Sequence, residues 1–92
     1  MDRIEQIMER GRRARAVLDN ETVTEALDHI TAQLERQWRA TTAKMTETRE
    51  SLFHQVAAMD ALRAQLKGWV EAADFEQKQL EKHNARRLKL VR

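Results

Sequence analysis

The chain has 92 residues, of which 41% are hydrophobic and 35% are charged, so it is too apolar for a disordered chain and too charged for a membrane-spanning one. It has no cysteine, which excludes disulfides, thiolate metal ligands and cysteine nucleophiles. The N-terminus lacks the basic-then-apolar pattern of a secretion signal. We therefore expect a single cytoplasmic domain, and we expect it to self-associate because the core of such a short chain is marginal.

Charge is distributed unevenly along the chain, although the net charge is only +2. Residues 1–15 carry five arginines and three acids, residues 16–81 carry seven bases and twelve acids, and residues 82–92 carry five bases and no acid. The three segments therefore have net charges of +2, −5 and +5. An acidic middle with basic ends favours head-to-tail pairing or the binding of a polyanion.

The first predicted helix covers about residues 2–18. Its apolar stripe has helical spacing and consists of Ile4, Ile7, Met8, Gly11, Ala14, Val17 and Leu18. Gly11 lies on this stripe, where glycine costs about 1 kcal/mol relative to alanine. Either the helix merely tolerates this glycine, or the missing side chain allows another helix to approach closely.

A second helix is predicted over about residues 21–40. Asp19 or Asn20 can cap it by accepting a hydrogen bond from a free backbone N–H. Its apolar stripe consists of Val23, Ala26, Leu27, Ile30, Leu34 and Trp38. On the polar face, Glu35 and Arg39 have the spacing of an ion pair.

The third predicted helix covers residues 46–82. Its stripe is the longest and consists of Leu52, Val56, Met59, Leu62, Leu66, Trp69 and Ala73. Threonines cluster at residues 41–48, which we interpret as a turn between antiparallel helices, with Thr46 as the N-cap. The alternative is a continuous rod over residues 21–80, because threonine is a poor helix former rather than a helix breaker. Residues 83–92 are then a fraying helix or a mobile basic tail.

No group of residues is typical of catalysis or of metal or cofactor binding. Ser51 is the only serine, and it lies in no nucleophile elbow or phosphate-binding loop. Two Glu–His pairs, at residues 25 and 29 and at residues 50 and 54, have a four-residue spacing. Metal sites in helical bundles use a three-residue step instead, so we interpret these as surface pairs. We expect no enzyme activity, metal, cofactor or small-molecule substrate.

The aromatic residues divide into two groups. Trp38 and Trp69 lie on the apolar stripes and are expected in the core, with Trp38 near Leu52 or Phe53. Three residues at the edge of the third stripe are candidate contacts with a protein partner or a second copy of the chain: Phe53, Val70 and Phe75.

The clustered cations at the two ends are candidate contacts with nucleic acid. They are Arg10, Arg12, Arg13, Arg15, Lys82, Arg86, Arg87, Lys89 and Arg92. No helix-turn-helix turn, zinc spacing or aromatic stacking platform accompanies them. Leu88, Leu90 and Val91 do not form the clean apolar face of a membrane-surface helix, so we expect no membrane contact.

Several short motifs give the sequence a resemblance to a group of viral proteins. They are Ala16-Val17-Leu18-Asp19-Asn20, Glu25-Ala26-Leu27, Trp38 before the threonines, Thr48-Arg49-Glu50-Ser51-Leu52, and Leu62, Leu66 and Gly68 before a Gln/Glu/Lys-rich end. Over about residues 16–80 the chain resembles short helical proteins of tailed bacteriophages, encoded among head and packaging genes. The resemblance implies particle assembly, genome packaging or a host interaction, in the host cytoplasm or the virion.

The sequence thus predicts an all-α fold with a short N-terminal helix and an antiparallel helical hairpin, three-helix or coiled-coil-like and oligomeric. We expect a non-enzymatic protein that docks its helices onto itself or onto a protein partner. The alternatives are a nucleic-acid-binding accessory protein that uses its basic ends, and a small inhibitor of a host protein.

Overall fold

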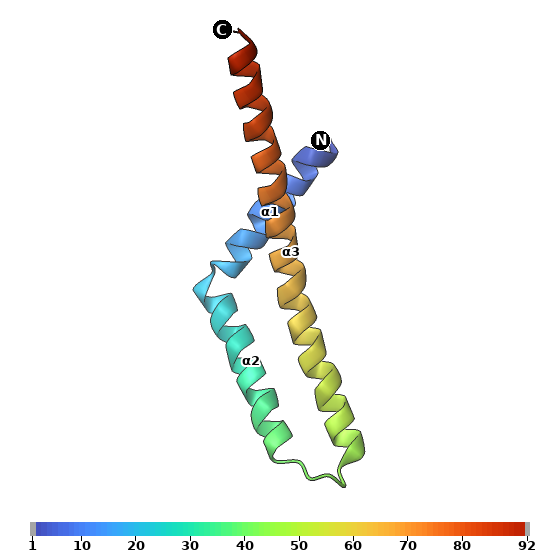
Figure 1. Cartoon of the computed structure of the whole chain (residues 1–92). Coiled ribbons are helices and arrows are strands. Elements are labelled where there is room, and N and C mark those ends of the chain that lie inside the picture. Colours follow the sequence, from blue (N-terminus) through green and yellow to red (C-terminus); the bar gives the residue numbers. More distant parts are fainter. Residues whose placement is uncertain (1, 92) are drawn as a thin grey trace. The chain divides into compact units, whose positions relative to one another are not determined.

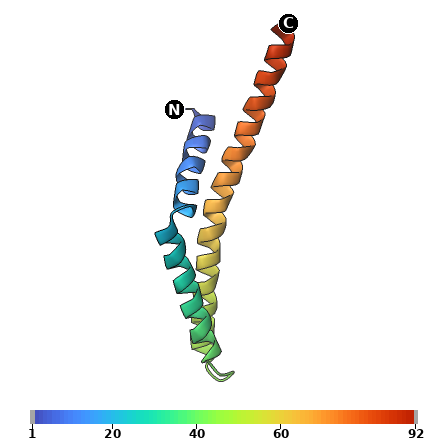
Figure 2. The ribbon, with the colours of Figure 1, turned by 90° about the vertical axis from the view of Figure 1, so that its left-hand side faces the viewer.

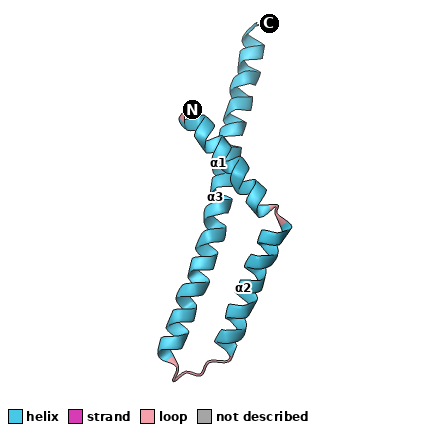
Figure 3. Ribbon diagram, turned by 180° about the vertical axis from the view of Figure 1, so that it is seen from behind, coloured by secondary structure: helices cyan, strands magenta, loops and turns pink. Residues whose placement is uncertain are grey.

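A computed structural model of the chain describes residues 2–91 and is all-helical over that range (Figures 1 and 3). The described residues form three helices, α1 (Arg3–Leu18), α2 (Glu21–Arg39) and α3 (Thr46–Val91), and no strand. The predicted all-α class is confirmed. The chain divides into two compact units, the first from the described parts of Met1–Val17 and Leu66–Arg92 and the second from Leu18–Gln65.

Side chains close the short connection between α1 and α2. The backbone of Asn20 is extended, and its side chain accepts a hydrogen bond from the backbone N–H of Val23 at 3.0 Å. The Thr24 hydroxyl donates to the carbonyl of Leu18 at 3.1 Å. Only Asp19 and Asn20 separate the two helices. So short a connection is possible because the side chains of Asn20 and Thr24 form hydrogen bonds with a backbone N–H and a carbonyl that have no partner within their own helix. Of the two predicted caps, Asn20 is the one used.

The threonine-rich segment separates α2 from α3. The backbone N–H and the hydroxyl of Thr41 both donate to the carbonyl of Trp38, at 3.0 and 2.7 Å, and the N–H of Met45 donates to the carbonyl of Thr42 at 3.0 Å. Because this hydroxyl occupies a carbonyl that a continuing helix would use, the segment turns. The alternative of one rod over residues 21–80 is therefore wrong. Thr46, predicted as a cap, is the first residue of α3.

The C-terminal segment is helical, and α3 continues from the predicted end at residue 82 to Val91. No proline or glycine follows Gly68 to stop the helix, and alanine, leucine, lysine and arginine are good helix formers. The basic residues after position 82 are thereby held at fixed helical spacing. Arg92 lies outside the described residues.

In the second unit, α2 packs against the first part of α3. Leu52 is buried, and Val56, Met59 and Arg63 follow it at steps of four, three and four as half-buried residues. This alternation is the seam of a coiled coil. Leu62, which the predicted stripe included, is 46% exposed, and Arg63 takes the inner position. Its guanidinium reaches α2, with Nη2 donating to Asp28 Oδ1 at 3.0 Å and to Thr31 Oγ1 at 3.4 Å.

In the first unit, α1 lies against α3 (Figures 1 and 2). Gly11 is buried at this contact. A Cβ atom at this position would overlap the Cβ of Ala73 and would lie 2.8 Å from the carbonyl oxygen of Trp69. Ala14, one turn further along α1, is also buried. Of the two interpretations of Gly11, the structure supports close helix approach.

The two glycines offer a matched test of this approach. Gly68 is also inside a helix, but a Cβ there would meet nothing within 4 Å. We expect Gly68→Ala to raise the free energy of unfolding by about 0.5–1 kcal/mol, the intrinsic helix preference of alanine. Gly11→Ala should lower it by about 1–3 kcal/mol, because its methyl group meets backbone that cannot move aside locally.

Urea unfolding followed by circular dichroism measures both changes. Equal stabilisation by the two substitutions would show that α1 does not pack on α3 at Gly11.

Candidate functional site

The three predicted interface residues differ in how much of each side chain is exposed to solvent. Phe53 is 63% exposed and Phe75 is 58% exposed. Val70 is half-buried and lines a hollow between α1 and α3, together with Met8 and Ala73. Val70 therefore contributes to packing inside the first unit, whereas the two phenylalanines present their rings to solvent.

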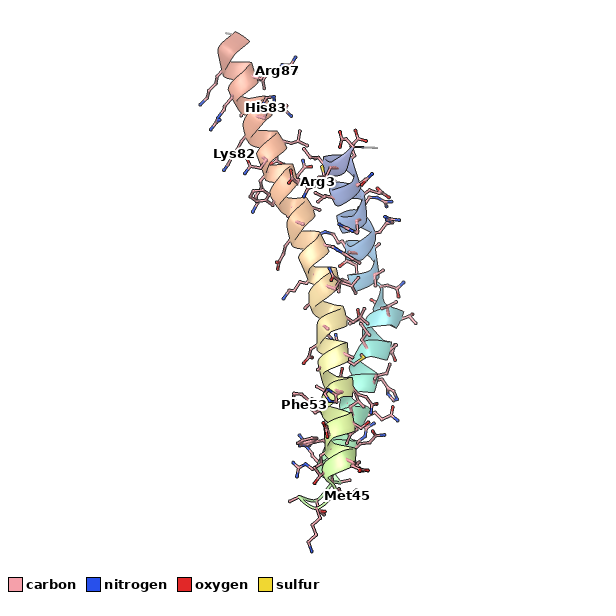
Figure 4. The ribbon with its side chains drawn as sticks, turned by 90° about the vertical axis from the view of Figure 1, so that its right-hand side faces the viewer. Arg3, Met45, Phe53, Lys82, His83 and Arg87 are labelled. Carbon is pink, nitrogen blue, oxygen red and sulfur yellow. The ribbon has the colours of Figure 1, made fainter. Side chains whose placement is uncertain are left out.

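One exposed surface of the second unit combines aromatic rings with a cation. We call it the Trp38 patch, and it consists of Trp38, Arg49, Phe53 and Val56. Trp38 was expected in the core, but it is 39% exposed. As predicted, it lies near Phe53, and the two rings line a hollow of about 360 Å³ together with Val56 and parts of Glu35 and Arg39. The same two rings line a second hollow beside the connection of α2 to α3. Figure 4 shows Phe53 on α3, near the end marked by Met45.

Arg49 is the member of the patch that sequence reasoning missed. Its guanidinium carbon lies 4.3 Å from the centroid of the Trp38 ring, a cation–π contact of about 0.5–1 kcal/mol at a partly exposed site. The signal was present in the sequence, since Arg49 lies one helical turn before Phe53 and precedes the start of the predicted stripe. The contact holds the indole in one orientation and leaves its other parts open.

Most N-terminal arginines that were candidate nucleic-acid contacts make contacts within the first unit. The guanidinium of Arg10 lies 5.0 Å from the Trp69 ring centroid, which places Trp69 beside α1. Arg15 bonds to both oxygens of Asp74 on α3, at 3.1 and 3.2 Å. This ion pair joins the two helices of the first unit.

Arg12 is bound within its own helix. Its Nε donates to Glu9 Oε2 at 2.9 Å. This hydrogen bond, with the attraction between the charges, lowers the pKa of the Glu9 carboxyl and raises the pKa of the Arg12 guanidinium. Arg13 is exposed and lines a shallow surface with Arg3 and Arg10. The N-terminal cluster is therefore not a set of equivalent free cations.

The C-terminal cations behave differently. Lys82, Arg86, Arg87 and Lys89 are all exposed, and none of them forms an ion pair with another described residue. Arg92, the fifth candidate in this segment, lies outside the described residues. Of the two basic ends, the C-terminal one keeps its charges available.

The Glu–His pairs remain separate. His54 Nε2 lies 3.9 Å from Glu50 Oε1, an exposed contact that is charged only when the imidazole is protonated. Among the described residues, no group of three or more His, Cys, Asp or Glu side chains could hold a metal ion. No polar or charged side chain is buried over the same range. None of the helices that the structure describes combines the length and apolar character that crossing a membrane requires.

Comparison with known proteins gives no relative from which a function can be transferred. No family model, curated protein or solved structure matches the chain. The resemblance to phage proteins therefore stays a prediction.

Alanine substitutions at the neighbouring residues Leu52 and Phe53 test whether the exposed Phe53 ring contributes to the stability of the fold. Leu52 is 4% exposed, so Leu52→Ala should lower the free energy of unfolding by about 2–4 kcal/mol through lost burial and the resulting cavity. Phe53→Ala should change it by less than about 1 kcal/mol at low protein concentration, because most of the ring is already in water.

Chemical unfolding of both variants, at several protein concentrations, makes the comparison. A loss at Phe53 as large as that at Leu52 would mean that the ring is part of the core.

Proposed function

We propose that this chain is a non-enzymatic interaction protein that assembles with copies of itself through apolar helix faces. The observation that supports this most directly is the number of large apolar side chains that the two units leave exposed. In the described chain they are Ile4, Val17, Ile30, Trp38, Met45, Phe53, Leu62, Phe75, Leu80 and Leu88. Against them, the buried hydrophobic residues among those described are Ala14, Leu34 and Leu52.

This imbalance has a direct physical consequence. Burying a large apolar side chain contributes about 1.5–3 kcal/mol, while ordering each residue of the backbone costs about 1–2 kcal/mol. Two buried leucines and one alanine therefore contribute little toward ordering the helices. A second copy placed on the open faces adds apolar burial without requiring further backbone to become ordered.

The Trp38 patch has the composition expected at the centre of such a contact. Tryptophan and arginine are enriched among the residues that dominate binding energy, and they act best in a well-packed apolar setting. In Trp38, Arg49 and Phe53 the second unit presents this combination beside hollows that another side chain can fill. We place the main self-contact there and a second contact at Phe75.

The antiparallel helical hairpin predicted from the sequence is part of this proposal, and the way in which two such hairpins meet is added to it. Two antiparallel helix pairs that meet by their open faces form a four-helix bundle, in which each seam is covered on both sides. A two-fold contact of this kind uses the same patch on both copies and closes on itself. The phage setting implied by the sequence resemblance, in particle assembly or packaging, is part of this proposal.

Charge placed on the exposed rings tests the assembly. Phe53→Asp and Phe75→Asp should each shift the chain toward monomer, because a carboxylate cannot be buried unpaired in an apolar contact. Gln79→Asp is the matched control, since it adds the same charge at an exposed polar position of α3. Light scattering after size exclusion gives the mass, and circular dichroism verifies the helix content.

A wild-type chain that is monomeric at about 100 μM, well above a micromolar dissociation constant, would contradict self-assembly. If Phe53→Asp assembles as the wild type does, the Trp38 patch is not part of the interface. If Phe75→Asp assembles as the wild type does, Phe75 is not part of it.

Tryptophan fluorescence locates the contact independently. In a Trp69→Phe variant, Trp38 is the only tryptophan left in the chain. Its emission should shift to shorter wavelength as protein concentration rises through the assembly range, because the indole loses contact with water. Emission that stays constant while the mass increases would place the interface elsewhere.

A further inference from the structure

The last part of α3 forms a positively charged helical arm, which we define as residues 82–91. Its described cations are Lys82, Arg86, Arg87 and Lys89, and no acid follows Glu81 in the sequence. The arm is continuous with the helix that packs in the first unit, so its charges have fixed spacing rather than the random spacing of a tail. A regular array of one sign of charge is a feature that a regular polyanion can match.

The arm takes no part in the packing of the first unit. All described side chains from Lys82 to Lys89 are exposed. Figure 4 shows Lys82, His83 and Arg87 projecting from α3 beyond the level of Arg3, where α1 begins. By contrast, Arg10, Arg12 and Arg15 are each bound to a side chain of their own unit. The fold therefore separates structural arginines from cations that are free to bind.

Four cations fall on one stripe of the arm and the turn before it. Lys78, Lys82, Arg86 and Lys89 follow one another at steps of four, four and three residues, which places them within about a quarter of the helix circumference. The stripe is about 16 Å long at about 1.5 Å per residue. The major groove of duplex DNA is about 12 Å wide and admits an α-helix.

The composition of the arm distinguishes between polyanions. No Phe, Tyr or Trp follows Phe75, and His83 is the single aromatic ring of the arm, so the arm lacks the series of rings on which successive single-stranded bases stack. The major groove of duplex RNA is too narrow for a helix to enter. Leu88, Leu90 and Val91 do not form the single clean apolar stripe of a membrane-surface helix, because Leu90 does not share the three-residue spacing of the other two. An acidic protein surface mixes both signs of charge, whereas a duplex carries one negative charge per about 1.7 Å.

We propose that this arm binds the phosphate backbone of duplex DNA without sequence preference. The segment over residues 16–81 has a net charge of −5 and as a whole repels the same polyanion, so the arm, with Lys78 beside it, forms the main contact. The inference does not depend on the proposed self-assembly, because the arm and the Trp38 patch share no residue.

The test is binding of the full chain to a fluorescently labelled 30-base-pair duplex of mixed sequence, measured by anisotropy between 50 and 200 mM salt. With about four phosphate contacts per chain, the slope of log affinity against log salt should be about −3.6, an affinity loss of roughly 100-fold over this range. Replacing Lys82, Arg86 and Lys89 by glutamine should reduce the slope to about −1 and remove most binding at 50 mM salt.

A matched control carries glutamine at Arg36, Lys44 and Lys67. These three cations are also exposed and form no ion pair in the described chain, so the change in net charge is the same. The control should bind DNA within a few-fold of the wild type. Equal loss in both variants, or no loss in the arm variant, would overturn the proposal.

Two further measurements distinguish DNA from the other possible binding partners of the arm, which are a membrane surface and a second protein chain. Wild-type binding to vesicles with 30% anionic lipid but not to the duplex would assign the arm to a membrane and overturn the proposal. A lower mass of the arm variant in light scattering without DNA would assign it to contact between protein chains, with the same consequence. Unchanged mass and lost DNA binding support the arm as a DNA contact, whatever the outcome at Phe53.

Discussion

The constraint on which the structure depends is that each helix segment has at most one neighbouring helix within its unit. A helix with one neighbour buries a single narrow seam, and the rest of its circumference meets solvent. In the second unit the seam contains Leu34 and Leu52, and in the first it contains Gly11 and Ala14. The exposed aromatic residues follow from the same constraint, because a stripe wider than the seam extends beyond its edge.

The composition of each seam determines how closely its helices approach. At Gly11 the absence of a side chain allows the backbone of α1 to come near the carbonyl of Trp69. The helices of the first unit are therefore held by close backbone contact at this point and not by large apolar side chains. In the second unit the inner position at residue 63 belongs to an arginine that spans to Asp28 and Thr31. A partly exposed bridge of this kind contributes about 0–1 kcal/mol, less than burial of a leucine at the same position, and it links the two helices at this level.

Helix class and connections could be predicted from the sequence because they depend on local chemistry. The stripes at helical spacing, the cap at Asn20 and the turn after Trp38 each involve residues within a few positions of one another. The inner residue of α3 could not be predicted in the same way. Leu62 and Arg63 are equally compatible with a single helix, and only the contact with α2 puts the arginine inside.

The exposure of some surface residues could be predicted from the sequence, whereas that of others depends on contacts between helices. Exposure of Phe53 and Phe75 was anticipated from their position at the edge of the stripe, whereas Val70, grouped with them, faces α1. The exposure of Trp38 was not anticipated, because an apolar residue on a stripe belongs to the core only where a second layer covers it. No local pattern reports how many layers a fold will have.

The distribution of arginine and lysine follows from the same packing. In the first unit, arginines beside the seam become part of it by stacking on Trp69 or by pairing with Asp74. Guanidinium groups suit both tasks, since they are planar and donate several hydrogen bonds in fixed directions. Past the level of Arg3, α3 has no neighbouring helix in its unit and therefore no aromatic ring or carboxylate to meet. A basic sequence that would be neutralised inside a seam keeps its charge there, so the length by which α3 extends past α1 leaves this run of cations exposed to solvent.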